Sequence, residues 1–336
     1  VEADPSVVNL TAFETFFPER RPFFVEGNNI FRFDIGYPYF TRGVGFRNDG
    51  PFYTRRIGRA PQAGLPSDAA YADVPAAANI LAAAKLSGKT AGGWSLGVLD
   101  ALTGREHADY QDALGVRRSV EVEPLSNYGV ARVIRDFRGG QSAVGGIFTA
   151  TVRNLDGPQL DFLRTSAYLG GLDTRHRFDH GNREFAASFA VSHIRGSRAA
   201  LQQVQLGRGH YFQRPGAPHL HYDSTATSLS GFAASLRYEK FGGSRWRYGL
   251  YGHARSPGFE MNDLGFQRTT DWALQGGWLG YQVSQPGRWY RQWNVNLHNW
   301  AGVSFGGERQ ALGFNSNGGI QFLKFRHAPL ELEPVL

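Results

Sequence analysis

The stretch Gln292-Trp-Asn-Val-Asn-Leu-His-Asn-Trp-Ala-Gly-Val-Ser-Phe305 decides the fold that the sequence predicts. In an extended strand, successive side chains point to opposite faces. One face of this stretch is apolar except for one asparagine and carries Trp293, Val295, Leu297, Asn299, Ala301, Val303 and Phe305. The other face is polar except for one tryptophan and carries Gln292, Asn294, Asn296, His298, Trp300, Gly302 and Ser304. A helix would scatter these side chains around its circumference, so the pattern favours a strand.

The length of this strand separates two all-β architectures. Strands of soluble sandwiches are usually about 5–6 residues long. A strand that crosses a membrane as part of a barrel needs about 9–11 residues, with apolar side chains toward lipid and polar side chains toward the lumen. The stretch 292–305 has both properties. We therefore interpret it as a membrane-spanning barrel strand.

Similar alternating runs follow one another from Ile80 onward and amount to roughly a dozen strands. Their connections alternate in length, being short at 138–141, 179–182, 241–244 and 285–287 and long at 154–165, 195–227 and 256–270. Outer-membrane barrels alternate short periplasmic turns with longer outer loops. Two connections break this rule, because 103–118 is too long for its place and 306–310 is too short. The predicted fold is an all-β, antiparallel, outer-membrane-type transmembrane β-barrel of roughly 12–16 strands.

The composition agrees with this class and excludes others. The chain has no cysteine, so neither disulfides nor thiolate metal sites are possible. It has no apolar run of about 18 residues, so we expect no transmembrane helix. The net charge is +7, and only four of the 36 basic residues are lysines. Because the arginines are dispersed and no nucleic-acid motif accompanies them, we interpret them as salt-bridge partners along a lumen and expect no nucleic-acid partner.

Residues 1–78 differ from the rest because they do not alternate cleanly. The run Thr15-Phe-Phe-Pro-Glu-Arg-Arg-Pro-Phe-Phe-Val-Glu-Gly27 is dense in aromatic, charged and proline residues, and proline at this density argues against central strands. We predict an irregular plug or strap inside a barrel formed by residues 79–336. An ion network of Arg20, Arg21 and Glu26 would pin this segment, because buried charges need partners. The run Ala76–Ala84 is compatible with a short helix.

Aromatic side chains in the longest connection are the candidate ligand-binding residues. Tyr211, Phe212, His221 and Tyr222 could stack on sugar rings through their aromatic faces. The alternative is an aromatic belt at the membrane interface. We expect an oligosaccharide to be the kind of ligand that such a set would bind.

The same connection contains a weak candidate metal site. His219 and His221 are two residues apart, so on a strand they would face the same way, and Asp223 follows them. Imidazole and carboxylate ligands suit zinc. The alternative is a set of exposed loop histidines, and we assign neither a metal nor a cofactor.

Two carboxylates, Glu260 and Asp263, lie in the connection 256–270 near Arg255 and Arg268. Glycoside hydrolysis uses two carboxylates about 5–10 Å apart, and this pair is the catalytic candidate that the sequence offers. Carboxylates among arginines more often form salt-bridged anchors. No catalytic residue is therefore assigned, and both stay weak candidates.

Several blocks of the chain resemble a bacterial domain of unknown function. These blocks are Val1–Gly27, Phe52–Arg59, Ala84–Gly88, Gly129–Gly140, Tyr211–Pro215 and Arg255–Phe266. In that family the domain follows a module similar to carbohydrate-binding module family 9. The resemblance implies an outer-membrane-type β-barrel, often described as a membrane-associated hydrolase, with the N-terminal sugar-binding module of the same gene product as its partner.

The expected function follows from the barrel. The chain starts at Val1 without a signal peptide and ends at Leu336 rather than on an aromatic residue, so we expect it to be part of a longer gene product. We expect it to lie in the bacterial outer membrane, in contact with lipid, and to bind or pass a ligand such as an oligosaccharide. One alternative is a membrane-associated glycoside hydrolase. The other is a soluble secreted glycan-binding β-protein, which would place Trp293 and Val295 in a closed core.

Overall fold

The computed structural model describes residues 8–10, 13–35, 48–324 and 327–332, and most of them lie in two antiparallel sheets. The smaller sheet has the order β1-β4-β5, made of Ala69–Asp73, Glu106–Asp112 and Arg117–Glu123. The larger sheet has 12 strands in the order β15-β14-β13-β12-β11-β10-β9-β8-β7-β6-β3-β2. Its strands are β2 (Ile80–Lys89), β3 (Trp94–Thr103), β6 (Leu125–Phe137), β7 (Ser142–Asn154), β8 (Arg164–Phe178), β9 (Arg183–Gly196), β10 (Ser228–Lys240), β11 (Trp246–Arg255), β12 (Trp272–Val283), β13 (Tyr290–Val303), β14 (Arg309–Phe322) and β15 (His327–Leu332).

Helices are few and short. They are α1 (Pro22–Val25), η1 (Asn28–Phe31), η2 (Thr54–Arg56), η3 (Pro158–Leu160) and α2 (Arg198–Leu206). None of the helices in the described residues is long and apolar enough to cross a membrane. The prediction of an all-β, antiparallel fold is confirmed.

The alternation predicted from the opening stretch is confirmed in β13. Val295 and Leu297 are 45% and 40% exposed on one face of the sheet, which we call the outer face. Asn294, Asn296 and His298 lie on the opposite face, which we call the inner face, and are half-buried. Since strand residues that pair directly across a sheet share a face, the register extends this assignment from β13 to the other strands.

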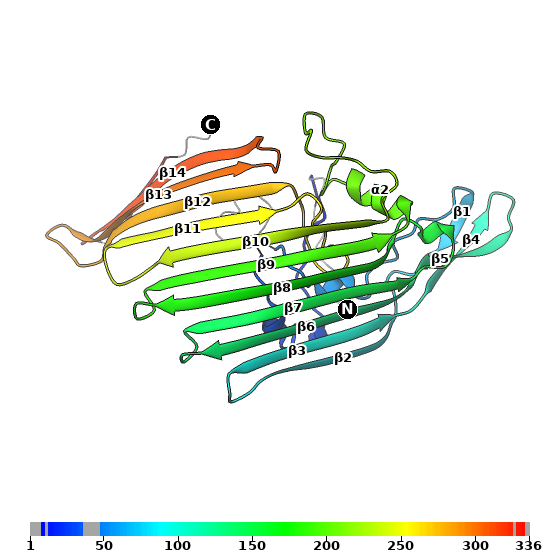
Figure 1. Cartoon of the computed structure of the whole chain (residues 1–336), viewed down its shortest axis with the longest axis horizontal. Helices are drawn as coiled ribbons and strands as arrows, with labels where there is room; N and C mark the ends of the chain where they lie inside the picture. Colours follow the sequence, from blue (N-terminus) through cyan, green and yellow to red (C-terminus); the bar gives the residue numbers. More distant parts are fainter. Residues whose placement is uncertain (1–7, 11–12, 36–47, 325–326, 333–336) are drawn as a thin grey trace.

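The larger sheet does not form the predicted closed ring. Among the described residues, β2 pairs only with β3, and β15 pairs only with β14. These two strands are therefore the edges of an open sheet, and closure into a barrel stays a prediction. Figure 1 shows the strands side by side, with the small sheet beyond one end of them.

The lengths of the connections follow the predicted alternation. Short turns join β6 to β7, β8 to β9 and β10 to β11, whereas α2 lies in the long connection between β9 and β10. The apparent exception near residue 103 disappears, because β3 pairs with β6 and the residues between them form β4 and β5 of the second sheet. The connection between β13 and β14 remains short at the end where the others are long.

The helix considered for Ala76–Ala84 is wrong. Ile80–Lys89 forms β2, in which Ala84 pairs with Asp100 and Leu86 pairs with Val98. Pairing with β3 satisfies the backbone of this run, and this tertiary contact overrides the helix propensity of alanine. Strand β1 likewise lies inside residues 60–78, which contain too much proline and alanine to show a strand pattern.

The N-terminal segment, residues 13–35, crosses the inner face. Lys85 of β2 donates to the main-chain oxygens of Phe23 and Glu26, and Ser188 of β9 donates to that of Asp34. Phe31 and Phe33 lie over Gly97 and Gly171, where an added Cβ would clash with their rings. Figure 1 shows this segment in blue behind the strands. The core that it forms with the sheet contains Phe24, Phe31, Phe33, Ile35, Leu99, Tyr128, Val130, Ile147 and Leu169.

A second segment, residues 256–271 between β11 and β12, completes this core. Phe259, Met261 and Leu264 from this connection are buried in the same cluster. The connection touches β10 at Gly231, where a Cβ would lie 2.1 Å from the main-chain nitrogen of Phe259. Only glycine allows the two backbones to approach so closely. The inner face of β3 to β10 is thus covered by two irregular segments.

Candidate functional site

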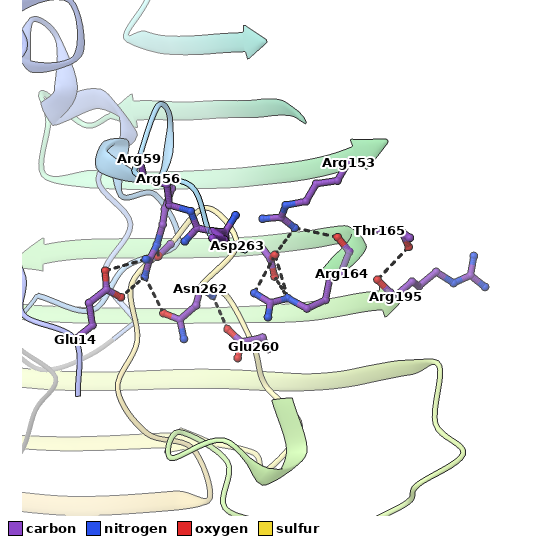
Figure 2. Close-up of polar contacts among 12 residues, drawn as sticks. Glu14, Arg56, Arg59, Arg153, Arg164, Thr165, Arg195, Glu260, Asn262 and Asp263 are labelled. Atoms are coloured by element: carbon purple, nitrogen blue, oxygen red, sulfur yellow. Dashed lines mark hydrogen bonds and ion pairs between the residues drawn. The ribbon is translucent and has the colours of Figure 1, made fainter. Parts of the chain in front are cut away.

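The N-terminal part of the chain and the connection 256–271 meet over the inner face. Gly50 and Phe266 form a β-bridge, and the amide of Tyr53 donates to the carbonyl of Leu264 across 2.7 Å. Arg56 makes a bidentate pair with Glu14 at 2.9 and 2.7 Å and donates to the carbonyl of Gly265 at 3.0 Å. Figure 2 shows Arg56 between Glu14 and Asn262. These contacts fix the connection that carries both catalytic candidates.

Asp263 is held by two arginines from the ends of neighbouring strands. Arg153 of β7 donates to its Oδ1 at 2.6 Å, and Arg164 of β8 donates to both of its oxygens at 3.1 Å. Figure 2 shows both guanidinium groups converging on this carboxylate. The side chains of Asp263 and Arg153 are only 2% and 0% exposed. Burial alone would raise the pKa of Asp263, but the two guanidinium charges hold it well below its usual range.

Glu260 pairs with a histidine from the longest connection. His210 Nε2 lies 2.9 Å from Glu260 Oε2, and His210 Nδ1 lies 2.7 Å from the carbonyl of Pro257. Glu260 and the carbonyl of Pro257 are both acceptors, and each lies within hydrogen-bond distance of one ring nitrogen of His210. Burial opposes ionisation of Glu260, but His210 and Arg164 outweigh it and lower its pKa. We call Glu260, Asp263, Arg153, Arg164 and His210 the ionic cluster.

The chemistry of the ionic cluster is that of an anchor. A general acid needs a carboxyl group that keeps its proton near neutral pH, whereas the surroundings of Glu260 and Asp263 favour their ionised forms. Both carboxylates are buried and hydrogen-bonded, and neither lines the polar cavity described below. The arrangement therefore matches the salt-bridged interpretation of these two residues.

Acid is expected to destabilise the protein through this cluster. The pKa of Glu260 and Asp263 in the folded state lie below their ordinary values of 4.5 and 3.8. Stability from these groups is fully present above those ordinary values and is lost as the pH falls through the folded pKa. The unfolding temperature of the wild type should therefore fall steeply below about pH 5. The double variant Glu260→Gln, Asp263→Asn should show a flatter profile, and equally steep profiles would contradict this assignment.

The four predicted sugar-stacking residues differ in their surroundings. Tyr211 and Tyr222 are 45% and 41% exposed, and His221 is also exposed. Phe212 instead packs its ring edge to face against His210, with centroids 5.9 Å apart. This position places Phe212 beside the ionic cluster rather than with the exposed aromatics.

Two of the three candidate metal ligands, His219 and Asp223, have separate partners, and the third, His221, is exposed. His219 Nε2 lies 2.9 Å from Asp271, which also accepts from Arg214 at 2.6 Å. Asp223 accepts from the amide and hydroxyl of Thr225 in a local turn. Within the described ranges no group of three or more histidine and acidic side chains is arranged to hold a metal ion.

The residues of the predicted N-terminal ion network are distributed differently. Arg21 pairs with Glu19 at 2.8 Å and donates to the carbonyls of Thr54 and Ile57. Burial opposes ionisation of Glu19, but its contacts with Arg21 lower its pKa to about 2. The amide of Arg20 also donates to Glu19, whereas Glu26 uses its main-chain oxygen to bind Lys85. Glu19 is therefore an acidic partner of Arg20 and Arg21 that the predicted network did not include.

A polar cavity of about 540 Å³ lies between the N-terminal segment and the inner face. Arg132 and Asp173 line this cavity and form a bidentate pair in which both hydrogen bonds are 2.7 Å long. Glu184 accepts from Arg177 and Arg237 on either side. Arginines that pair along the polar face were expected from the sequence, but their carboxylate partners were not, because the strand assignments followed the apolar positions. Charged residues at every second position, as in Asp173, Arg175 and Arg177, are the signal that could have found them.

The fold and the site define an all-β protein in which irregular segments and ion pairs fill one face of a large antiparallel sheet. The chain belongs to the family of DUF5916, a domain of unknown function, whose profile matches residues 1–332. Comparison with curated proteins gave no match. The resemblance to a domain of unknown function is thus confirmed, and the preceding sugar-binding module stays a prediction.

Proposed function

We propose that the larger sheet lies in a bacterial outer membrane, with its outer face against lipid, and that the protein binds a ligand such as an oligosaccharide on its inner face. The observation that carries this proposal is the apolar character of the outer face. Soluble monomers rarely expose contiguous apolar patches larger than a few hundred Å². Exposed apolar side chains extend here from β3 to β14, namely Leu96, Val98, Val133, Val144, Phe148, Leu172, Phe189, Val191, Leu236, Leu250, Leu279, Val295, Leu297, Leu312 and Phe314.

Aromatic side chains flank this aliphatic band on the outer face. Toward the short connections, Phe178 contacts Tyr238, which contacts Tyr248. In the same region Tyr281 contacts both Trp246 and Trp293, with centroids 4.8 and 5.4 Å apart. Aromatic girdles of this kind mark the two interfaces of membrane barrels.

A second aromatic row lies toward the long connections. Phe232 contacts Phe189 and Phe305, with centroids 6.0 and 5.9 Å apart, and Phe148 stacks on Tyr168. In β10, Leu236 lies between Phe232 and Tyr238 along the strand, and Leu297 lies between Trp293 and Phe305. Aliphatic side chains between two aromatic rows are also found on membrane barrels. A soluble glycan-binding protein would instead need a second layer over Val295, which is 45% exposed.

The edges of the sheet set a further requirement. In hydrocarbon every backbone polar group needs a partner, so open edges do not occur there. Closure of β2 onto β15 would satisfy both edges and would enclose the polar inner face, the ionic cluster and the N-terminal segment. Closure is therefore part of the proposal.

The experiment that tests the proposal is a heat-dependent gel shift combined with vesicle flotation. The folded protein in detergent should migrate faster before boiling than after it, and it should float with phospholipid vesicles after detergent removal. A protein that stays soluble without detergent and whose mobility does not change on boiling would overturn the membrane location.

A further inference from the structure

A second hollow, of about 320 Å³, lies at the inner face of β11, β12 and β13. This volume is at the lower end of the roughly 300–1,000 Å³ typical of ligand pockets. The hollow is separate from the 540 Å³ cavity and shares no lining residue with it. It is lined by Arg247, Trp278, Gly280, Gln282, Gln292, Trp293, Asn294 and Asn296.

Trp278 provides a flat apolar surface in this hollow. It pairs directly with Gly249 of β11, and a Cβ on that glycine would lie 2.2 Å from the indole Nε1. The indole therefore lies over the glycine, where a larger residue would displace it. Its plane is within 28° of that of His298. A flat aromatic ring of this kind can stack on the C–H face of a sugar.

Amide side chains surround the indole. Asn296 donates to Asn317 at 2.9 Å, and Asn317 donates to Asn315 at 2.7 Å. Gln282 and Asn294 also line the hollow. Amides offer both donors and acceptors, which matches sugar hydroxyl groups that also do both. No carboxylate is among the described residues that line the hollow.

Arg247 is the charged member of the set, and it differs from other inner-face arginines. Arg132, Arg153 and Arg255 each pair with a carboxylate at 2.7 Å or less. No ion pair joins Arg247 to a carboxylate in the described part of the chain, and its buried Nε has no hydrogen-bond partner there. An arginine fork of this kind suits a carboxylate, sulfate or phosphate group.

We propose that this hollow binds an acidic sugar residue. One face of the sugar ring stacks on Trp278, its hydroxyl groups bind the amides of Gln282 and Asn294, and its anionic group binds Arg247. The inference rests on the proposed ligand-binding function and specifies its site and its ligand class. It does not depend on where the protein is located.

Calorimetric titration of the folded protein in detergent tests this site, with tri-galacturonic acid as the acidic probe and maltotriose as the neutral one. The wild type should bind the acidic trisaccharide more tightly. Arg247→Gln should weaken the binding of tri-galacturonic acid by about tenfold or more, because hydrogen bonds to charged groups are stronger than those between neutral groups. The binding of maltotriose should be unchanged. Trp278→Ala should weaken the binding of both trisaccharides. Arg288→Gln and Trp289→Ala, at exposed positions of the β12–β13 connection, are matched controls that should bind as the wild type does.

Arg247→Lys extends the test if the glutamine variant does not fold, since lysine keeps the charge but loses the fork. We expect the lysine variant to bind tri-galacturonic acid more weakly than the wild type but still measurably. A wild type that binds neither trisaccharide, or Arg247 variants that bind tri-galacturonic acid as the wild type does, would overturn the inference. A wild type that floats with vesicles but binds no acidic sugar overturns this site alone. A wild type that binds tri-galacturonic acid but does not insert into vesicles would overturn only the proposed membrane location.

Discussion

Asp263→Ala is expected to lower the free energy of unfolding by about 3–5 kcal/mol, the usual cost of removing one partner from a buried ion pair. The variant would leave two guanidinium groups without their shared carboxylate. Arg153 is fully buried, and its Nε and Nη2 already have no hydrogen-bond partner among the described residues. Asp263 therefore compensates the charge of Arg153, whose side chain cannot reach water to replace the lost carboxylate.

The midpoint of the heat-dependent gel shift measures this loss. Asp68→Ala is the matched control, because Asp68 is exposed and exposed substitutions usually stay within about 0.5 kcal/mol. Arg153→Met and Arg164→Met combined with Asp263→Leu should recover much of the loss, since a buried ionic group can often be replaced by apolar residues at little cost. A single Asp263→Ala variant as stable as the wild type would show that the ionic cluster does not anchor the connection 256–271.

Leu297→Arg is the second substitution with a large expected effect. Leu297 lies in the aliphatic band of the outer face, where it pairs with Leu279 and Ser316. In lipid, an arginine at mid-depth on a barrel costs about 2–4 kcal/mol. In water the same change would cost little, because the side chain is 40% exposed and exposed substitutions are nearly neutral.

The matched control is Asn296→Arg, one residue earlier and on the inner face. Both variants are unfolded with urea in phospholipid vesicles, and their free energies of unfolding are compared. We expect Leu297→Arg to be the less stable by at least about 2 kcal/mol. Equal stabilities of the two variants would contradict lipid contact at Leu297.

The sequence predicted strands well because side-chain alternation is local. In β13 the extended conformation and the two faces follow from the alternation along Tyr290–Val303 itself. Short and long connections were also visible, since turn residues mark them. The helix considered for Ala76–Ala84 was wrong because intrinsic helix propensity, even that of alanine, is a weak signal, and pairing with β3 makes Ile80–Lys89 a strand.

The partners in the site could not be predicted, because they are distant in the chain. Arg153 and Asp263 are 110 residues apart, and Arg132 and Asp173 are 41 residues apart. Such pairs depend on which strands become neighbours and on where the connection 256–271 folds back. The sequence alone singled out Glu260 and Asp263 as a pair of carboxylates. Their burial and their arginine and histidine partners could not be predicted from it.

Lipid contact of the outer face is tested most directly by single cysteines placed at residues 293–298, which the absence of native cysteines makes possible. Spin labels at each position are probed in vesicles for collisions with oxygen, which concentrates in lipid, and with a water-soluble nickel chelate. The account predicts a period of two, with Val295 and Leu297 accessible to oxygen and Asn294 and Asn296 to the chelate. Equal chelate access at all positions, or protection of Val295 and Leu297 from both reagents, would contradict it.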